Sequence, residues 1–140
     1  MTGGARIHWG WILLAAFLAE MSIMVVFFVL LAAATLAGAP ELARPESTLD
    51  LIDAMVASFV MMFLFTLWVG RRIESGFVLH GALIGLAAAL LFTTIIFVLS
   101  GSLAQHPLYL VAHGLKVIGG ITGGVVASKR AASHRTLVGT

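Results

Sequence analysis

The feature that most constrains the fold is a series of four long apolar runs separated by short polar stretches. The runs cover residues 8–38, 49–70, 76–99 and 107–128. Each is long enough for an α-helix to cross the ~30 Å hydrocarbon core of a bilayer. Because backbone polar groups within lipid must be satisfied inside the segment itself, such runs favour helices. The sequence therefore predicts an all-α integral membrane four-helix bundle that forms a single domain over residues 1–140.

Composition supports a lipid environment. Apolar residues make up 61% of the chain and charged residues only 10%, whereas soluble domains have about 45–50% and about 25%. The chain has no cysteine, which excludes disulfides, thiol catalysis and cysteine-ligated clusters. The pI near 9.7 reflects basic residues that flank the apolar runs, as topology signals do. We therefore expect the lipid bilayer as a partner and no nucleic acid.

The distribution of Lys and Arg predicts the orientation of the bundle. Six of these residues fall at one end, a single one falls at the other, and one lies within a span. Because cytoplasmic loops carry the excess of basic residues, both termini are expected inside, which is an N-in/C-in topology in a bacterial plasma (inner) membrane. Residues 129–140 are expected to form a cytoplasmic tail, of which the last ten residues are polar and frayed. The six basic residues are Arg6, Arg71, Arg72, Lys129, Arg130 and Arg135, the opposing one is Arg44, and the intramembrane one is Lys116.

Local signals mark two helix starts. Ser47, followed by Asp50 one helical turn later, has the spacing of an N-terminal cap, in which a hydroxyl accepts from a free backbone N–H and an acid lies at the positive end of the helix dipole. Pro107 suits the first turn of a helix, where its missing N–H costs nothing. The second and fourth helices are thus expected to begin close to these residues.

Two ionisable residues are expected near the middle of the membrane. Glu20 follows His8 by the same length of chain that separates Lys116 from Ser128. Counted from the cytoplasmic end, both would be ~18 Å deep in straight helices. Opposite charges at matched depth predict an ion pair between the first and fourth spans. The pair would be either an internal structural link or a proton or cation site centred on Glu20, because ionisable groups in a bilayer are costly and often functional.

Asp53 and His113 form a second set at matched depth, nearer the outer leaflet. The length of chain from Asp53 to Gly70 is similar to that from His113 to Ser128. A carboxylate–imidazole pair could relay protons, since histidine titrates near neutrality. Asp53 also lies one turn after Asp50, however, and two acids near a helix N-terminus are favoured by the helix dipole alone.

These polar residues could form a line across the outer half of the bundle. His113 and Lys116 are one helical turn apart and share one face of a helix. His8 and His80 are similar in depth, but two lone histidines do not define a haem site, and no residues have metal-ligand spacing, so no cofactor or metal is expected. The line would consist of Asp53, His113, Lys116 and Glu20, with Ser58 and Thr122 as extensions.

Small residues recur at four-residue spacing in the third and fourth runs. This spacing lets helix backbones touch, and dispersion and weak Cα–H···O contacts then hold the helices together. The expected role is packing of the third helix on the fourth, or an oligomer face, and two adjoining registers on the fourth helix allow both. The glycines concerned are Gly81 and Gly85 in the third run and Gly119, Gly120, Gly123 and Gly124 in the fourth.

The second half of the chain resembles a known group. The segment GFVLHG at 76–81, followed by ALIGL, resembles the third span of the YrzE-like family of uncharacterised small four-helix bacterial inner-membrane proteins. The segment LKVIGGITGGVVASKR at 115–130 is similar to the matching end of that family. The resemblance begins close to Gly76 and covers the rest of the chain. It implies the four-span fold and no assigned activity.

A second similarity concerns mechanism only. Leu18-Ala19-Glu20 is similar to the proton-binding site in the first helix of small multidrug-resistance transporters, which also have four helices. The present chain departs from that pattern, because its first run is much longer and its fourth run contains Lys116. The comparison therefore implies a way in which Glu20 could work and no family membership.

The sequence thus favours a non-enzymatic structural or accessory subunit, since no nucleophile–base set or metal set is visible. Such a subunit is expected to self-associate, as a homo-oligomer or within a membrane complex, through its glycine-rich helix faces. The alternative is a proton- or ion-coupled small transporter or channel-like oligomer that uses Glu20. Contact between Glu20 and Lys116 in a dry core would favour the subunit, whereas a crevice lined by both would favour transport.

Overall fold

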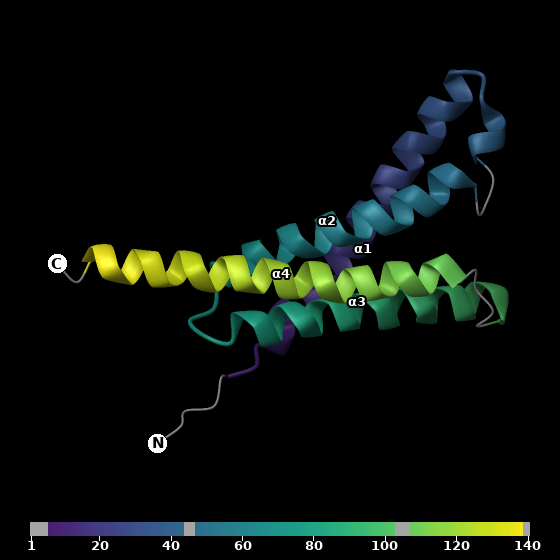
Figure 1. Cartoon of the computed structure of the whole chain (residues 1–140). Coiled ribbons are helices and arrows are strands. Elements are labelled where there is room, and N and C mark those ends of the chain that lie inside the picture. Colours follow the sequence, from purple (N-terminus) through teal and green to yellow (C-terminus); the bar gives the residue numbers. More distant parts are fainter. Residues whose placement is uncertain (1–5, 44–46, 103–106, 139–140) are drawn as a thin grey trace.

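The chain forms four long helices and one short 3-10 helix. The computed structural model describes residues 6–43, 47–102 and 107–138. In chain order the elements are α1 (Trp9–Leu36), η1 (Pro40–Ala43), α2 (Thr48–Gly70), α3 (Phe77–Ser100) and α4 (Pro107–Val138) (Figure 1). Within these residues there is no strand, and each long helix is long and apolar enough to cross a membrane. The predicted all-α, four-helix architecture is confirmed, while Arg44 lies outside the described residues.

The helices begin and end where local chemistry indicates. Ser47 caps α2, because its Oγ accepts a hydrogen bond from the Asp50 backbone N–H at 3.2 Å. Pro107 is the first residue of α4. Gly76 precedes α3 with φ +70° and Gly101 follows it with φ +67°, conformations that residues with a Cβ rarely adopt. Turn residues therefore set both ends of α3.

The last helix is longer than the sequence predicts. The fourth apolar run ends near Ser128, and the last ten residues were expected to be frayed, but α4 continues to Val138. The reason is that no Gly or Pro interrupts residues 129–138, and Lys, Arg and Ala have high helix propensity. Loss of hydropathy marks where a helix leaves lipid, and it does not mark where the helix ends.

The four long helices pack unequally. Helix α4 packs along both α2 and α3, and α1 packs on α2 and α3 as well, but no direct packing of α1 on α4 is found among the described residues. The start of α1, the α2–α3 turn and the end of α4 lie at the same end of the bundle (Figure 1). At the other end, the last part of α1, η1 and the first part of α2 lean away from α3 and α4 (Figure 1).

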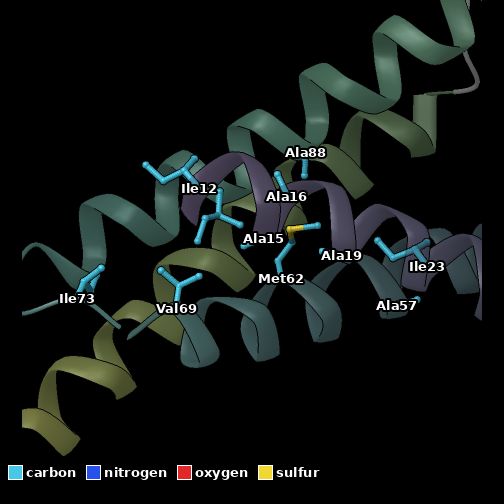
Figure 2. Packing of buried hydrophobic residues seen from close by; sticks show 11 residues of the cluster. Ile12, Ala15, Ala16, Ala19, Ile23, Ala57, Met62, Val69, Ile73 and Ala88 are labelled. Carbon is cyan, nitrogen blue, oxygen red and sulfur yellow. The ribbon is translucent and has the colours of Figure 1, made fainter. Parts of the chain in front are cut away.

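The core is built on a face of small residues. The buried residues of α1 from Ile12 to Ile23 recur at helical spacing, and three of them are alanines that let α1 approach its neighbours closely (Figure 2). Large apolar side chains instead point outward, as Phe28 at 57% and Leu90 at 61% exposed show. This arrangement suits a lipid surrounding, in which apolar surface needs no burial. The buried apolar residues of α1 are Ile12, Ala15, Ala16, Ala19 and Ile23.

The glycines of α4 contact two different helices. Gly120 meets the backbone of Gly81 in α3, and Gly124 meets the backbone of Phe77 and Val78 in the first turn of the same helix. A Cβ on Gly120 would collide with the Gly81 carbonyl group, which cannot rotate away. Through Gly120 and Gly124, the backbone of α4 therefore lies in direct contact with the backbone of α3.

The other register of α4 faces α2. A Cβ on Gly119 would lie 2.5 Å from the carbonyl oxygen of Phe59, and one on Gly123 would lie 2.7 Å from that of Phe63. Both glycine registers of α4 are thus covered within the chain. Because α2 and α3 already cover these glycines, self-association, which stays a prediction, would need another surface.

Candidate functional site

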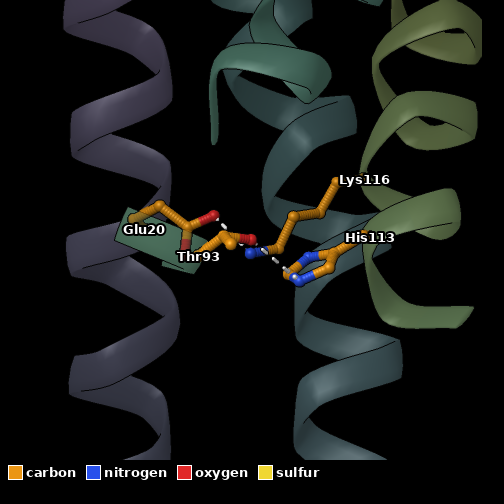
Figure 3. A network of polar contacts seen from close by, with 4 residues as sticks. All are labelled: Glu20, Thr93, His113 and Lys116. Atoms are coloured by element: carbon orange, nitrogen blue, oxygen red, sulfur yellow. Dashed lines mark hydrogen bonds and ion pairs between the residues drawn. The ribbon is translucent and has the colours of Figure 1, made fainter. Parts of the chain in front are cut away.

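Glu20 of α1 and Lys116 of α4 meet inside the bundle. Lys116 Nζ lies 2.6 Å from Glu20 Oε1, and the two side chains are 4% and 3% exposed (Figure 3). The contact is an ion pair rather than a well-aligned hydrogen bond. Lys116 Nζ also lies 4.5 Å from the centroid of the Phe92 ring in α3, within the range of cation–π attraction. The residues that were matched by depth in the sequence are therefore in direct contact.

The α1 side of this pair follows from helix periodicity. Ala16 and Ala19 are on the buried face of α1, and Glu20 lies one turn after Ala16, so it shares that face. The alanines keep α1 close to α2 and α3, and Glu20 on the same face is only 2% exposed. The same pattern that builds the core thus places a charge within it.

The α4 side depends on glycine packing. A Cβ on Gly85 of α3 would lie 2.5 Å from the Lys116 carbonyl oxygen and 2.6 Å from the Val117 Cα. The backbone of α4 is therefore held against α3 at the residue that carries the ammonium group. From this position the long lysine side chain reaches Glu20, although α1 and α4 do not pack directly on each other.

A pocket of about 300 Å³ lies beside the ion pair. All four long helices contribute to it, and its residues come in part from the segments of α1 and α2 that lean away from α3 and α4 (Figure 1). Most of its wall is apolar, formed by phenylalanine, isoleucine, leucine and methionine side chains. The polar lining residues are Glu20, Asp50, Asp53, Ser58, Tyr109, His113 and Lys116.

His113 lies one helical turn before Lys116 but does not pair with Asp53. Its Nε2 lies 3.5 Å from Thr93 Oγ1 of α3 (Figure 3), at the limit of a hydrogen bond. The imidazole ring contacts the edge of the Phe92 ring, with 5.5 Å between centroids. Its Nδ1 is buried and has no hydrogen-bond partner among the described residues. Of the two alternatives for Asp53, the Asp53–His113 pair is therefore not formed in this structure, because the imidazole is turned toward Thr93 and Phe92 of α3.

Asp53 is buried in α2 and lines the same pocket. Its side chain is only 6% exposed, and no hydrogen bond or ion pair joins it to another described residue. Asp50, one turn earlier, accepts a 2.6 Å hydrogen bond from the Tyr109 hydroxyl of α4. The alternative, in which both acids lie near the helix N-terminus because the helix dipole favours them there, thus fits Asp50 better than Asp53. Asp53 is directed inward.

The predicted polar line is only partly formed. Ser58 is buried and lines the pocket, whereas the Thr122 hydroxyl donates to the Ile118 carbonyl of its own helix and lies away from the pocket. The contact between Tyr109 and Asp50 was not predicted from the sequence. Both residues lie in the first turn of their helices, and the two helices start at the same end of the bundle. Their equal depth is the sequence feature from which this contact could have been predicted.

The histidine pair at the other end of the bundle has a structural role. His80, fully buried in α3, accepts a 3.1 Å hydrogen bond at Nε2 from the His8 backbone N–H, and its Nδ1 lies 2.9 Å from the Gly76 carbonyl oxygen. Because Nε2 accepts, Nδ1 carries the proton and donates to that carbonyl. Through Nε2, His80 thus fastens the segment before α1 to α3, and through Nδ1 it holds the first turn of its own helix.

No protein-family model, curated protein or solved structure matches this chain. The likeness of its second half to the YrzE-like group consequently stays a prediction. Within the part of the chain that the structure describes, no group of three or more metal-ligating side chains is present. The site is thus defined by its own geometry: a closed ion pair, an unpaired carboxylate, a half-buried imidazole and an apolar pocket that all of them line.

Proposed function

We propose that this chain is a multi-pass protein of a bacterial plasma membrane with both termini in the cytoplasm. Five of the six basic residues that predicted this orientation have described side chains, and they lie at the end of the bundle that holds the α2–α3 turn. Arg72 lies over two indole rings there, 5.4 Å from the centroid of Trp11 and 5.9 Å from that of Trp68. Tryptophan and arginine together are typical of a cytoplasmic membrane interface.

Cysteine labelling tests this orientation. The chain has no cysteine, so Glu41→Cys and Ser75→Cys, both at exposed positions, each introduce a single thiol. In intact cells, a membrane-impermeant maleimide should label position 41, and it should label position 75 only after the membrane is opened. Labelling of position 75 in intact cells, with position 41 protected, would reverse the proposed topology.

We propose further that the chain is a non-enzymatic structural or accessory subunit of a membrane complex. The closed Glu20–Lys116 pair carries this proposal. It links the first helix to the last, which otherwise do not pack on each other, and it uses both charges to hold the fold. A site that binds and releases a cation would need one of these charges to be available. Self-association remains a prediction, and it would require a surface other than the α4 glycines.

A second candidate is a proton- or ion-coupled small transporter or channel-like oligomer that uses Glu20. One observation favours it: Glu20 and Lys116 also line the pocket between the diverging helices. Uptake of a proton by Glu20 would break the ion pair and release the lysine side chain. The link between α1 and α4 would then open and close with protonation.

Proton flux separates the two candidates. Wild-type protein and Glu20→Gln are reconstituted into vesicles that contain a pH-sensitive dye, and a pH gradient is imposed with valinomycin and potassium present. The subunit proposal expects the wild type to leak no faster than Glu20→Gln, Glu41→Gln or empty vesicles. Glu41 is an exposed acid outside the pocket, which makes Glu41→Gln the matched control. Flux in the wild type and in Glu41→Gln that disappears only in Glu20→Gln would reject the subunit proposal and support transport.

A further inference from the structure

Asp53 is an ionisable side chain that the fold buries without giving it a partner. It is 6% exposed, lines the pocket, and has no hydrogen bond or ion pair with any described residue. Burial of a carboxylate without a partner is expensive. By contrast, Glu20 is paired with Lys116, and Asp50 accepts a hydrogen bond from Tyr109. The pocket therefore contains one buried carboxylate for which no described residue is a partner, and a bound cation would supply one.

The charge balance of the pocket indicates the sign of that partner. Glu20 and Lys116 neutralise each other, and among the described residues that line the pocket Lys116 is the only lysine or arginine. Asp53 remains without a counter-charge among the described residues, so it adds one uncompensated negative charge to the lining. An anionic ligand would be repelled by it, whereas a cation would offset the desolvation of Asp53.

The wall of the pocket indicates what kind of cation would fit. Most lining side chains are apolar, and four aromatic rings are among them. Aromatic faces attract weakly hydrated organic cations such as quaternary ammonium groups. The volume of about 300 Å³ is at the lower end for small-molecule sites. Divalent metal ions need several oxygen ligands gathered round one point, and the described residues contain no group of three or more His, Asp or Glu side chains placed to hold a metal ion. The four rings are those of Phe27, Phe28, Phe92 and Tyr109.

We propose that this pocket binds a small organic cation with an apolar body, an amine or quaternary ammonium compound, and that Asp53 is its counter-ion. The apolar body would lie against the phenylalanine rings, and the cationic group would lie next to the Asp53 carboxylate. Access from the side is available, because the lining residues Met24, Phe28 and Leu99 are 40%, 57% and 78% exposed. An amphipathic cation that partitions into the membrane could enter there, with the Glu20–Lys116 pair still closed.

Binding of benzyltrimethylammonium tests the proposal. The purified protein is titrated calorimetrically in a neutral maltoside detergent, with empty micelles as the blank. Asp53→Asn keeps the shape of the side chain and removes its charge, and it should weaken binding of the cation by about tenfold or more. Glu41→Gln removes the same charge outside the pocket and should leave the affinity unchanged. Phenylmethanesulfonate, an anion of similar size, should not bind.

Two further measurements keep the outcome decisive. Neopentylbenzene, in which carbon replaces the cationic nitrogen, should bind wild type and Asp53→Asn equally. Ala54→Leu, which adds volume at a half-buried lining position without changing charge, should weaken binding of both ligands, and it decides the matter should Asp53→Asn fail to fold. The proposal is overturned if the folded wild type does not bind the cation, if it prefers the anion, or if Asp53→Asn or Ala54→Leu binds the cation as the wild type does.

Discussion

Replacing Gly120 with isoleucine should prevent the bundle from folding in detergent, and Gly120→Ala should already destabilise it by about 3 kcal/mol or more. A Cβ at this position collides with the carbonyl group of Gly81. Because the obstacle is backbone, no side-chain rotation can relieve it, and α3 and α4 must separate. That separation would also shift Gly85 from the backbone of Lys116 and so disturb the ion pair. Thermal unfolding followed by circular dichroism in detergent measures the effect.

Gly114 supplies the matched control for this experiment. It lies in the same helix, but outside the neighbouring backbone of that helix no atom of a described residue lies within 4 Å of the position that its Cβ would take. Gly114→Ile should leave the unfolding temperature unchanged or slightly raise it, since glycine is a poor helix former. Equal loss of stability in the Gly114 and Gly120 variants would mean that helix propensity, and not close contact of α3 with α4, explains the result.

Removing either charge of the central pair should also destabilise the protein. Glu20→Gln leaves the Lys116 ammonium buried without its counter-ion, and Lys116→Met leaves the Glu20 carboxylate in the same position. A lone charge near the middle of a membrane helix costs about 2.5–3.5 kcal/mol on insertion scales. We expect each variant to lose about 2–3 kcal/mol, measured by titration with dodecyl sulfate in mixed micelles.

Glu41→Gln controls for loss of a charge as such. Glu41 is exposed in η1, outside the pair and the pocket, so its replacement should change stability by less than about 0.5 kcal/mol. If Glu20→Gln were as stable as this control, the buried pair would contribute nothing to the fold. The structural role that we propose for it would then be wrong.

Much of the fold could be predicted because long apolar runs, bounded by polar stretches, mark the helices that are long enough to cross a bilayer. The predicted limits of the first three spans agree closely with those of α1, α2 and α3. The fourth differs because hydropathy reports the edge of the membrane, whereas α4 continues to Val138. Glycine spacing predicted close helix contacts, but it could not show that Gly119 and Gly123 face α2 while Gly120 and Gly124 face α3.

From the sequence, contacts between polar residues of the site could be predicted only where the depth of each residue along the bundle is enough to decide which residues meet. Glu20 and Lys116 were matched by their distance along the chain from one end of the bundle, and both side chains lie on inward faces, so they meet. Asp53 and His113 were matched in the same way but do not touch, because depth does not give the direction of a side chain around its helix. His113 faces Thr93 and Phe92 instead. The pocket could not be foreseen, since it lies where the last part of α1 and the first part of α2 lean away from α3 and α4.

The most direct test of the structural role is the coupling between Glu20 and Lys116. The free energy of unfolding is measured for the wild type, Glu20→Gln, Lys116→Met and the double variant in mixed micelles. If the buried pair links α1 to α4, the double variant should recover much of the loss, because neither charge is then left alone, with a coupling energy of about 2 kcal/mol. Additive losses, with a coupling energy below about 0.5 kcal/mol, would contradict the account.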